Sequence, residues 1–165
     1  MPKRDSARYE GGFHASPECW EVFTEVLGKE FSNAVLFGQV HQLTVDEYAA
    51  QHAGGRHRDK SVVIHLCGLH LVLDRELRPT EVPPLFQRIA GVVKTWPHLS
   101  PPNGLSAMTV FDVALAESPQ DHARIVRDWA NFVWRKWSEQ HALIRSFVDA
   151  HLDFKERGEH GQHTE

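Results

Sequence analysis

The sequence predicts an all-α fold, a single-domain bundle of four main helices with one or two short extra helices. Three observations lead to this prediction. Apolar residues recur three or four positions apart through most of the chain, which is the period of a helix packed on one face. Residues typical of helix N-caps precede these stripes, and no alternating strand pattern extends beyond a few residues. The 165 residues are enough for one domain with a substantial core.

Each helix is predicted from its cap and its apolar stripe. Ser16 and Ser118 are each followed by proline, the combination expected at a helix N-terminus. Thr109 with Asp112 resembles a capping box, and so does Thr44-Val-Asp-Glu47, which predicts a bend near residue 43. The expected helices cover residues 17 to about 31, 34–41 with a second piece at 45–52, 62–76, 83–96, a short helix after 109, and a long one at 119–152.

Composition bounds the domain organisation and the function class. Residues 1–12 are expected to be a mobile N-terminal arm, 13–155 the helical bundle and 156–165 a disordered tail. A net charge of −4 excludes a basic nucleic-acid-binding field, and the apolar run at 62–73 is too short to cross a membrane. No signal peptide and no disulfide framework are expected, so the sequence predicts a cytoplasmic protein of bacterial type.

Three histidines, His41, His65 and His141, lie within apolar helical stripes. A buried imidazole needs a hydrogen-bond partner, a charge partner or a metal, because leaving it unpaired is costly. Three such residues on separate segments could converge, and a histidine trio commonly holds a transition metal. The alternative is a set of core histidines bonded to backbone carbonyls or to carboxylates such as Asp46 or Asp112.

Four further residues extend this candidate site. His52 is a fourth metal-ligand candidate, although a histidine also suits the C-terminal end of a helix without any ligand role. Asp46 could be a ligand or support one, and Tyr48 could supply a proton, so these two are the catalytic candidates. Cys19 in the first helical turn is either a thiol activated by the helix dipole or a small core residue.

The remaining histidines are predicted to play no part in the site. His70 is assigned to another face of its helix, five positions after His65. Surface or loop positions are expected for His14, His57, His98, His122, His151, His160 and His163.

The segment His-x-Leu-Thr-Val-Asp-x-Tyr-x-x-Gln-His at 41–52 is the most specific motif of the chain. With similar stretches at 16–20, 61–66, 109–113 and 129–141, it resembles an uncharacterised bacterial family, domain of unknown function 5946. The resemblance implies that His41, His52, His65 and His141 belong to the family pattern, and it supplies no activity. Some relatives carry an N-terminal Cys-x-x-Cys pair that this sequence lacks, so no zinc site on such a pair is expected. The bundle also looks like the DinB-type proteins, which hold a metal with three histidines, although the spacings differ.

Two functions follow from these residues. In the first, His41, His65 and His141, with His52 or Asp46, bind a divalent transition metal such as zinc or iron and act on a small molecule. In the second, the protein is a non-catalytic structural or interaction protein with satisfied core histidines. Its aromatic last helix would then form a homodimer interface through Phe132 and Trp134, which lie off the main stripe.

Overall fold

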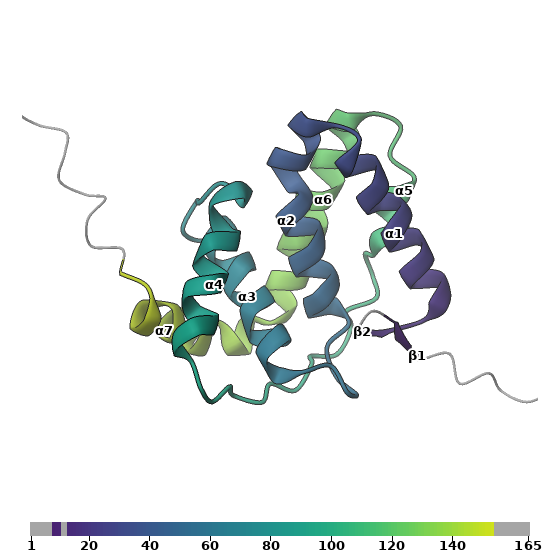
Figure 1. The fold of residues 1–165 in the computed structure, drawn as a ribbon. Coiled ribbons are helices and arrows are strands. Elements are labelled where there is room, and N and C mark those ends of the chain that lie inside the picture. Colours follow the sequence, from purple (N-terminus) through teal and green to yellow (C-terminus); the bar gives the residue numbers. More distant parts are fainter. Residues whose placement is uncertain (1–7, 11–12, 154–165) are drawn as a thin grey trace, which may run out of the picture.

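The computed structural model describes residues 8–10 and 13–153 and confirms the all-α fold (Figure 1). The helices are α1 (Pro17–Phe31), α2 (Ala34–Gln51), α3 (Asp59–Leu73), α4 (Val82–Val92), α5 (Val110–Ala114), α6 (Pro119–Lys136) and α7 (His141–His151). Two 3₁₀ turns, η1 (Pro79–Glu81) and η2 (Ser138–Gln140), precede α4 and α7. A short antiparallel ribbon joins β1 (Arg8–Glu10) to β2 (Phe13–Ala15), with Tyr9 opposite His14.

The predicted N-caps are confirmed at three helices. The Ser16 hydroxyl accepts a hydrogen bond from the Cys19 amide at 3.1 Å, and Ser118 caps α6 in the same way. Thr109 and Asp112 form a reciprocal capping box at α5. These contacts satisfy amides that a helix N-terminus leaves unpaired, which is why a local sequence signal was sufficient to place them.

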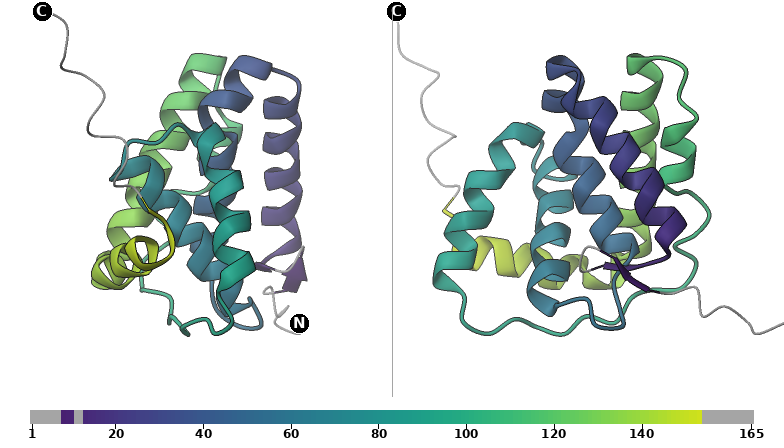
Figure 2. Two further views of the ribbon diagram at one scale, coloured as in Figure 1. Left: turned by 60° about the vertical axis from the view of Figure 1, so that its left-hand side comes forward. Right: turned by 45° about the vertical axis from the view of Figure 1, so that its right-hand side comes forward.

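Helix α2 is the central element of the fold. It packs against α1 on one side, α3 on another and α6 behind, as the views in Figures 1 and 2 show. Helix α5 lies against α1 and α6, whereas α4 and α7 lie against α3. Side chains that meet around α2, such as Leu43, Leu66 and Trp129, are fully buried. From Val40 to Ala50 no residue of α2 is exposed, so polar side chains there need partners inside the protein or must stay uncharged.

The bend predicted near residue 43 is wrong, because α2 runs unbroken from Ala34 to Gln51. Thr44 does not start a new helix. Its hydroxyl donates to the Glu30 carboxylate at 2.6 Å, and it also lies 3.3 Å from the Val40 carbonyl one turn earlier. A capping-box sequence thus occurs inside a helix, where the backbone amides are already bonded and the Thr44 hydroxyl bonds a carboxylate of α1 instead of a nearby amide.

The prediction of one long last helix at 119–152 is also wrong, because the apolar stripe is divided between two helices, α6 and α7. Helix α6 ends at Lys136, η2 follows, and α7 runs across α3 instead of continuing α6 (Figure 2). Trp137 lies at the break, where its buried indole donates to the Ala50 carbonyl at 3.2 Å. The break lets the first half of the stripe bury against α2 and the second half against α3.

Trp134 does not lie on a partner surface, contrary to the sequence-based prediction. Its side chain is only 4 % exposed, and its indole nitrogen donates to Asp74 at 3.2 Å. Phe132 is half-buried. His141, at the start of α7, stacks on Trp134, and a straight helix would not bring these two rings together in this way.

Two boundary predictions are only partly covered by the described residues. Residues 8–10 of the predicted arm form β1, whereas 1–7, 11–12 and the predicted tail at 156–165 lie outside the described part. Within the described part, no helix combines the length and apolar character needed to span a membrane.

Candidate functional site

Three carboxylates are completely buried in the core around α2. Glu30 of α1 and Asp46 and Glu47 of α2 each have 0 % exposure. A buried carboxylate is costly unless it is paired, hydrogen-bonded or protonated. The three groups meet these conditions in different ways. Together with His41, His65 and His122 they are called here the carboxylate–histidine network.

Glu30 accepts hydrogen bonds from three side chains. His41 Nδ1 lies 2.8 Å from its Oε2, while His122 Nε2 and the Thr44 hydroxyl lie 2.9 and 2.6 Å from its Oε1. Burial alone would raise the pKa of Glu30, but the hydrogen bonds outweigh burial and lower it. Glu30 is therefore ionised at neutral pH. Because an ionised carboxylate only accepts, both imidazoles must donate to it.

Asp46 and His65 form the second pair, between α2 and α3. Asp46 Oδ1 lies 2.7 Å from His65 Nδ1 and accepts from the Gln42 amide at 2.8 Å. Burial raises the pKa of Asp46 to about 6, against the lowering effect of the His65 hydrogen bond. The other oxygen, Oδ2, is buried without a hydrogen bond and packs against Gly68. A Cβ at Gly68 would lie 2.6 Å from Asp46 Cγ and 2.8 Å from Phe86 Cζ, so only glycine leaves room for this carboxylate.

Glu47 differs from the other two carboxylates because neither of its oxygens has a hydrogen-bond partner. Burial, reinforced by the negative charges of Glu30 and Asp46, raises the pKa of Glu47 well above its usual value. Glu47 is therefore the member of the network that retains a proton most strongly.

Two cavities open beside the network. The α1–α6 cavity has a volume of about 270 Å³, and His122 lies in its wall. The other lining residues are Lys29, Ser32, Asn33, Leu36, Ala116, Glu117, Ser118 and Pro119. The α2–η1 cavity, of about 80 Å³, is lined by Phe37, His41, Gln42, Pro79, Thr80 and Pro83. Because Glu30 bonds both His122 and His41, one carboxylate links the two cavities through hydrogen bonds.

The structure divides the predicted site residues among three places. His41, Asp46 and His65 belong to the carboxylate–histidine network. His52 and Tyr48 lie near the C-terminal end of α2, where His52 Nε2 is 3.2 Å from Cys19 Sγ.

His141 is separate from both groups. It begins α7, its Nε2 donates to the Trp134 carbonyl at 2.8 Å, and its ring stacks on the Trp134 indole at 3.8 Å between centroids. Among residues 8–10 and 13–153, no three or more His, Cys, Asp or Glu side chains are arranged to hold a metal ion. The core histidines His41, His65 and His122 are instead paired with buried carboxylates at 2.7–2.9 Å.

Sequence reasoning missed Glu30, Glu47 and His122. His122 was expected at the surface, yet it is only 3 % exposed. The signal was present in the spacing, because His122 lies four positions before Val126 and Glu30 lies four positions after Val26, both on apolar stripes. His57 was likewise assigned to a loop surface but is buried, with its Nε2 2.8 Å from the Ser61 hydroxyl.

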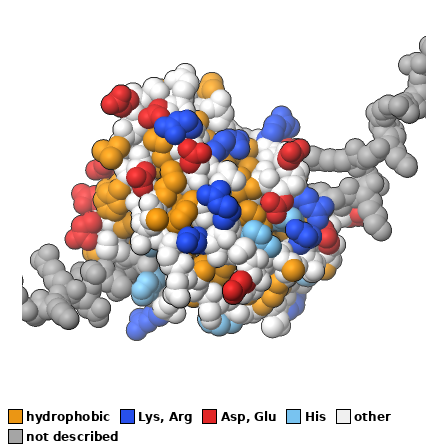
Figure 3. Space-filling view, turned by 180° about the vertical axis from the view of Figure 1, so that it is seen from behind, with side chains coloured by type: hydrophobic (Ala, Val, Ile, Leu, Met, Phe, Trp, Pro, Cys, Tyr) orange, Lys and Arg blue, Asp and Glu red, His pale blue; other side chains and the backbone are white. Residues whose placement is uncertain are grey.

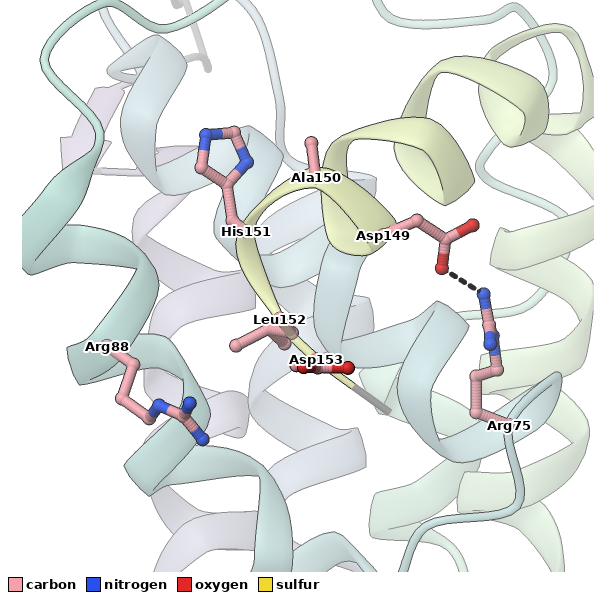
Figure 4. A pocket seen from close by; sticks show the side chains of 7 residues that line it. All are labelled: Arg75, Arg88, Asp149, Ala150, His151, Leu152 and Asp153. Carbon is pink, nitrogen blue, oxygen red and sulfur yellow. Dashed lines mark hydrogen bonds and ion pairs between the residues drawn. The ribbon is translucent and has the colours of Figure 1, made fainter. Parts of the chain in front are cut away.

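A larger open cleft of about 780 Å³ lies away from the network, at the C-terminal end of α7. Figure 4 shows Arg88 of α4 on one side and the Arg75–Asp149 ion pair on the other. None of the predicted site residues lines it.

On the face shown in Figure 3, acidic, basic and apolar side chains are interspersed. The predicted homodimer remains a prediction.

The fold and the network define a class: an all-α protein with carboxylate–histidine pairs buried around a central helix. A family model described as "Family of unknown function (DUF5946)" matches residues 6–138. The chain belongs to this DUF5946 family, as the sequence resemblance indicated. No curated protein and no solved structure matches the chain.

Proposed function

We propose that this protein binds a small molecule in the α2–η1 cavity and that His41 is the acid–base group there. The observation that carries the proposal is the position of His41, which lines the cavity while its Nδ1 donates to the buried Glu30 carboxylate. Because Nδ1 carries the hydrogen, Nε2 has the lone pair of the neutral ring and can accept a proton from a ligand.

The surroundings of His41 support this role. Its ring stacks on Phe37 at 4.3 Å between centroids and contacts Phe31 at 4.8 Å, so its orientation is fixed before a ligand arrives. The His41 side chain is 17 % exposed, whereas Glu30 is fully buried. A buried carboxylate that orients a partly exposed imidazole is the arrangement of a general base. The small volume and the proline and phenylalanine lining favour a ligand of a few heavy atoms with an apolar body and one hydrogen-bond donor.

We expect such a ligand to shift the imidazole resonances of His41 saturably. The probes are acetamide, 2-propanol and pyrazole, added separately to protein with ¹⁵N-labelled histidine. His41→Gln should weaken binding of the responding probe at least about tenfold, which corresponds to 1.4 kcal/mol. His98→Gln is the matched control, because His98 is exposed and pairs with Asp59 away from the cavity. The proposal fails if no probe moves the His41 signals, or if the variant binds as well as the wild type.

A second candidate function is binding of a divalent transition metal, zinc or iron, through His41 and His65. One observation favours it: both rings have Nδ1 on a carboxylate, as metal-ligating histidines commonly do. Further ligands would have to move into place, since the described residues hold no preformed group of three.

Elemental analysis of tag-free protein after reconstitution with Zn²⁺ or Fe²⁺ tests the metal directly. Metal binding predicts close to one equivalent in the wild type and its loss in His65→Asn, with retention in His98→Gln. Less than about 0.2 equivalents of either metal after reconstitution would rule this function out.

A further inference from the structure

A second polar cluster lies where the N-terminal turn of α1 meets the C-terminal end of α2. Cys19 Sγ is 3.2 Å from His52 Nε2, and the Tyr48 ring packs on the His52 imidazole at 4.4 Å between centroids. These three residues and the His14 carbonyl are called the thiol–imidazole cluster. It shares no residue with the carboxylate–histidine network.

The tautomer of His52 follows from its other neighbour. His52 Nδ1 lies 3.1 Å from the His14 carbonyl oxygen, which can only accept a hydrogen bond. Nδ1 therefore carries the hydrogen, and the lone pair of the neutral ring lies on Nε2, facing Cys19. The thiol donates to this nitrogen. A nucleophile, a base within hydrogen-bond reach and a third group that orients the base are the three parts of an activated nucleophile.

The backbone around His52 holds this geometry. The His14 amide donates to the His52 carbonyl at 3.1 Å, and His57 Nδ1 donates to the same carbonyl at 3.0 Å. Gly55 has a φ of 56°, and a Cβ there would lie 3.1 Å from His14 Cε1. The turn after α2 therefore requires a glycine for the His14 side chain to stay in place.

We propose that Cys19 is a nucleophile toward small hydroperoxides, with His52 as its base. The sulfur attacks the distal peroxide oxygen, an S–O bond forms, and the O–O bond breaks. The thiol proton passes to His52 Nε2 and then to the leaving oxygen, which departs as water or an alcohol. The sulfur is oxidised to a sulfenic acid and the peroxide is reduced, so no further reactant is needed.

The surroundings of the thiol favour a reagent of this size. Cys19 is only 7 % exposed, and neighbouring Trp20 and Phe23 pack against Tyr48. A hydroperoxide presents only its two oxygen atoms to the sulfur. Burial raises the pKa of the Cys19 thiol, against the effect of the Tyr48 hydrogen bond, so the resting sulfur is protonated and needs a base.

His52 is available as that base over a wide pH range. Burial lowers the pKa of His52 to about 4 and outweighs the hydrogen bond to the His14 carbonyl, which acts to raise it; the imidazoles of His14 on β2 and His57 before α3 act in the same direction as burial. Its other polar neighbours are Cys19 of α1 and Tyr48 of α2. Because the His52 ring stays neutral, it can accept the thiol proton throughout this range. We therefore expect Cys19 to react at nearly the same rate between about pH 6 and pH 8, whereas a free thiol slows about tenfold per pH unit below its pKa.

Hydrogen peroxide with dimedone trapping, read by mass spectrometry, tests the proposal. Cys67 is the internal control, because it is fully buried and burial raises its pKa to about 12. We expect dimedone on Cys19 and not on Cys67, with folded protein reacting faster than urea-unfolded chain at about pH 6. His52→Gln should slow Cys19 about 10²-fold, and His98→Gln should not.

Three results would overturn the proposal: equal labelling of both cysteines, a folded chain slower than the unfolded one, or no effect of His52→Gln. If His52→Gln fails to fold, the comparison of folded with unfolded wild type and its pH profile decide. Neither measurement involves His41, so failure here leaves the proposed ligand site untouched.

Discussion

Glu30→Gln is expected to lower the free energy of unfolding by about 3 kcal/mol or more at neutral pH, because it removes one partner from buried charge-assisted contacts. Glutamine has nearly the shape of glutamate, so the loss reports charge and hydrogen bonding rather than a cavity. The carboxylate accepts from His41, His122 and Thr44, and one amide oxygen cannot accept all three as strongly. Urea unfolding at neutral pH measures the difference.

The pH dependence of this effect has a definite sign. The folded pKa of Glu30 is lowered from its ordinary value of 4.5, so its contribution is fully present above about pH 4.5 and is lost as the pH falls through the folded value. Wild type and Glu30→Gln should therefore converge in acid. Glu25→Gln on the exposed face of α1 is the matched control and should change stability by less than about 0.5 kcal/mol. An equally small effect of Glu30→Gln would contradict the role assigned to Glu30.

Glu47→Gln is expected to raise the free energy of unfolding by at least about 2 kcal/mol near neutral pH. Both carboxylate oxygens of Glu47 are buried without partners, and Glu30 and Asp46 add negative charge nearby. Removing the ionisable group removes the cost of either ionising it or keeping it protonated. A neutral amide of similar shape carries only the burial cost of an uncharged polar group, which the protonated carboxyl carries too.

The sign for Glu47 is opposite to that for Glu30. Its folded pKa is raised above 4.5, so wild-type stability falls as the pH rises from 4.5 toward the folded value. The advantage of Glu47→Gln should grow by about 1.4 kcal/mol per pH unit in that window and nearly vanish below it. Urea unfolding at a series of pH values measures this growth, with Glu25→Gln again as control. A difference that is independent of pH would show that Glu47 is not held protonated.

The helices and their caps were largely predictable from the sequence, because their causes are local. Ser16, Thr109 and Ser118 satisfy amides within their own first turns, and the apolar stripes follow the helix period. The two main errors both concern whether a helix continues through a given residue. Thr44 looked like a cap and lies inside α2, while Trp137 looked like the middle of a helix and ends one. In both cases the deciding contact comes from a residue far along the chain.

The candidate site was predictable only in part. The apolar positions of His41 and His65 correctly indicated that these imidazoles need partners, and Asp46 was correctly considered as one of them. Glu30 and His122 follow the same spacing and are buried, although His122 was expected at the surface and charged residues such as Glu30 are rarely buried unless paired. Helical period shows which residues face inward, but it does not pair a residue of α1 with one of α6.

The sequence by itself determined an all-α chain, the starts of its helices and the inward direction of several histidines, since each depends on neighbours within a turn or two. Only the tertiary structure decided what those histidines contact. The packing of α1, α3 and α6 around α2 places His41 and His122 on one carboxylate and His65 on another, and moves His52 to Cys19 and His141 to Trp134. The physical reason is that a buried imidazole bonds the nearest available hydrogen-bond partner, and that partner is fixed by helix packing rather than by chain position.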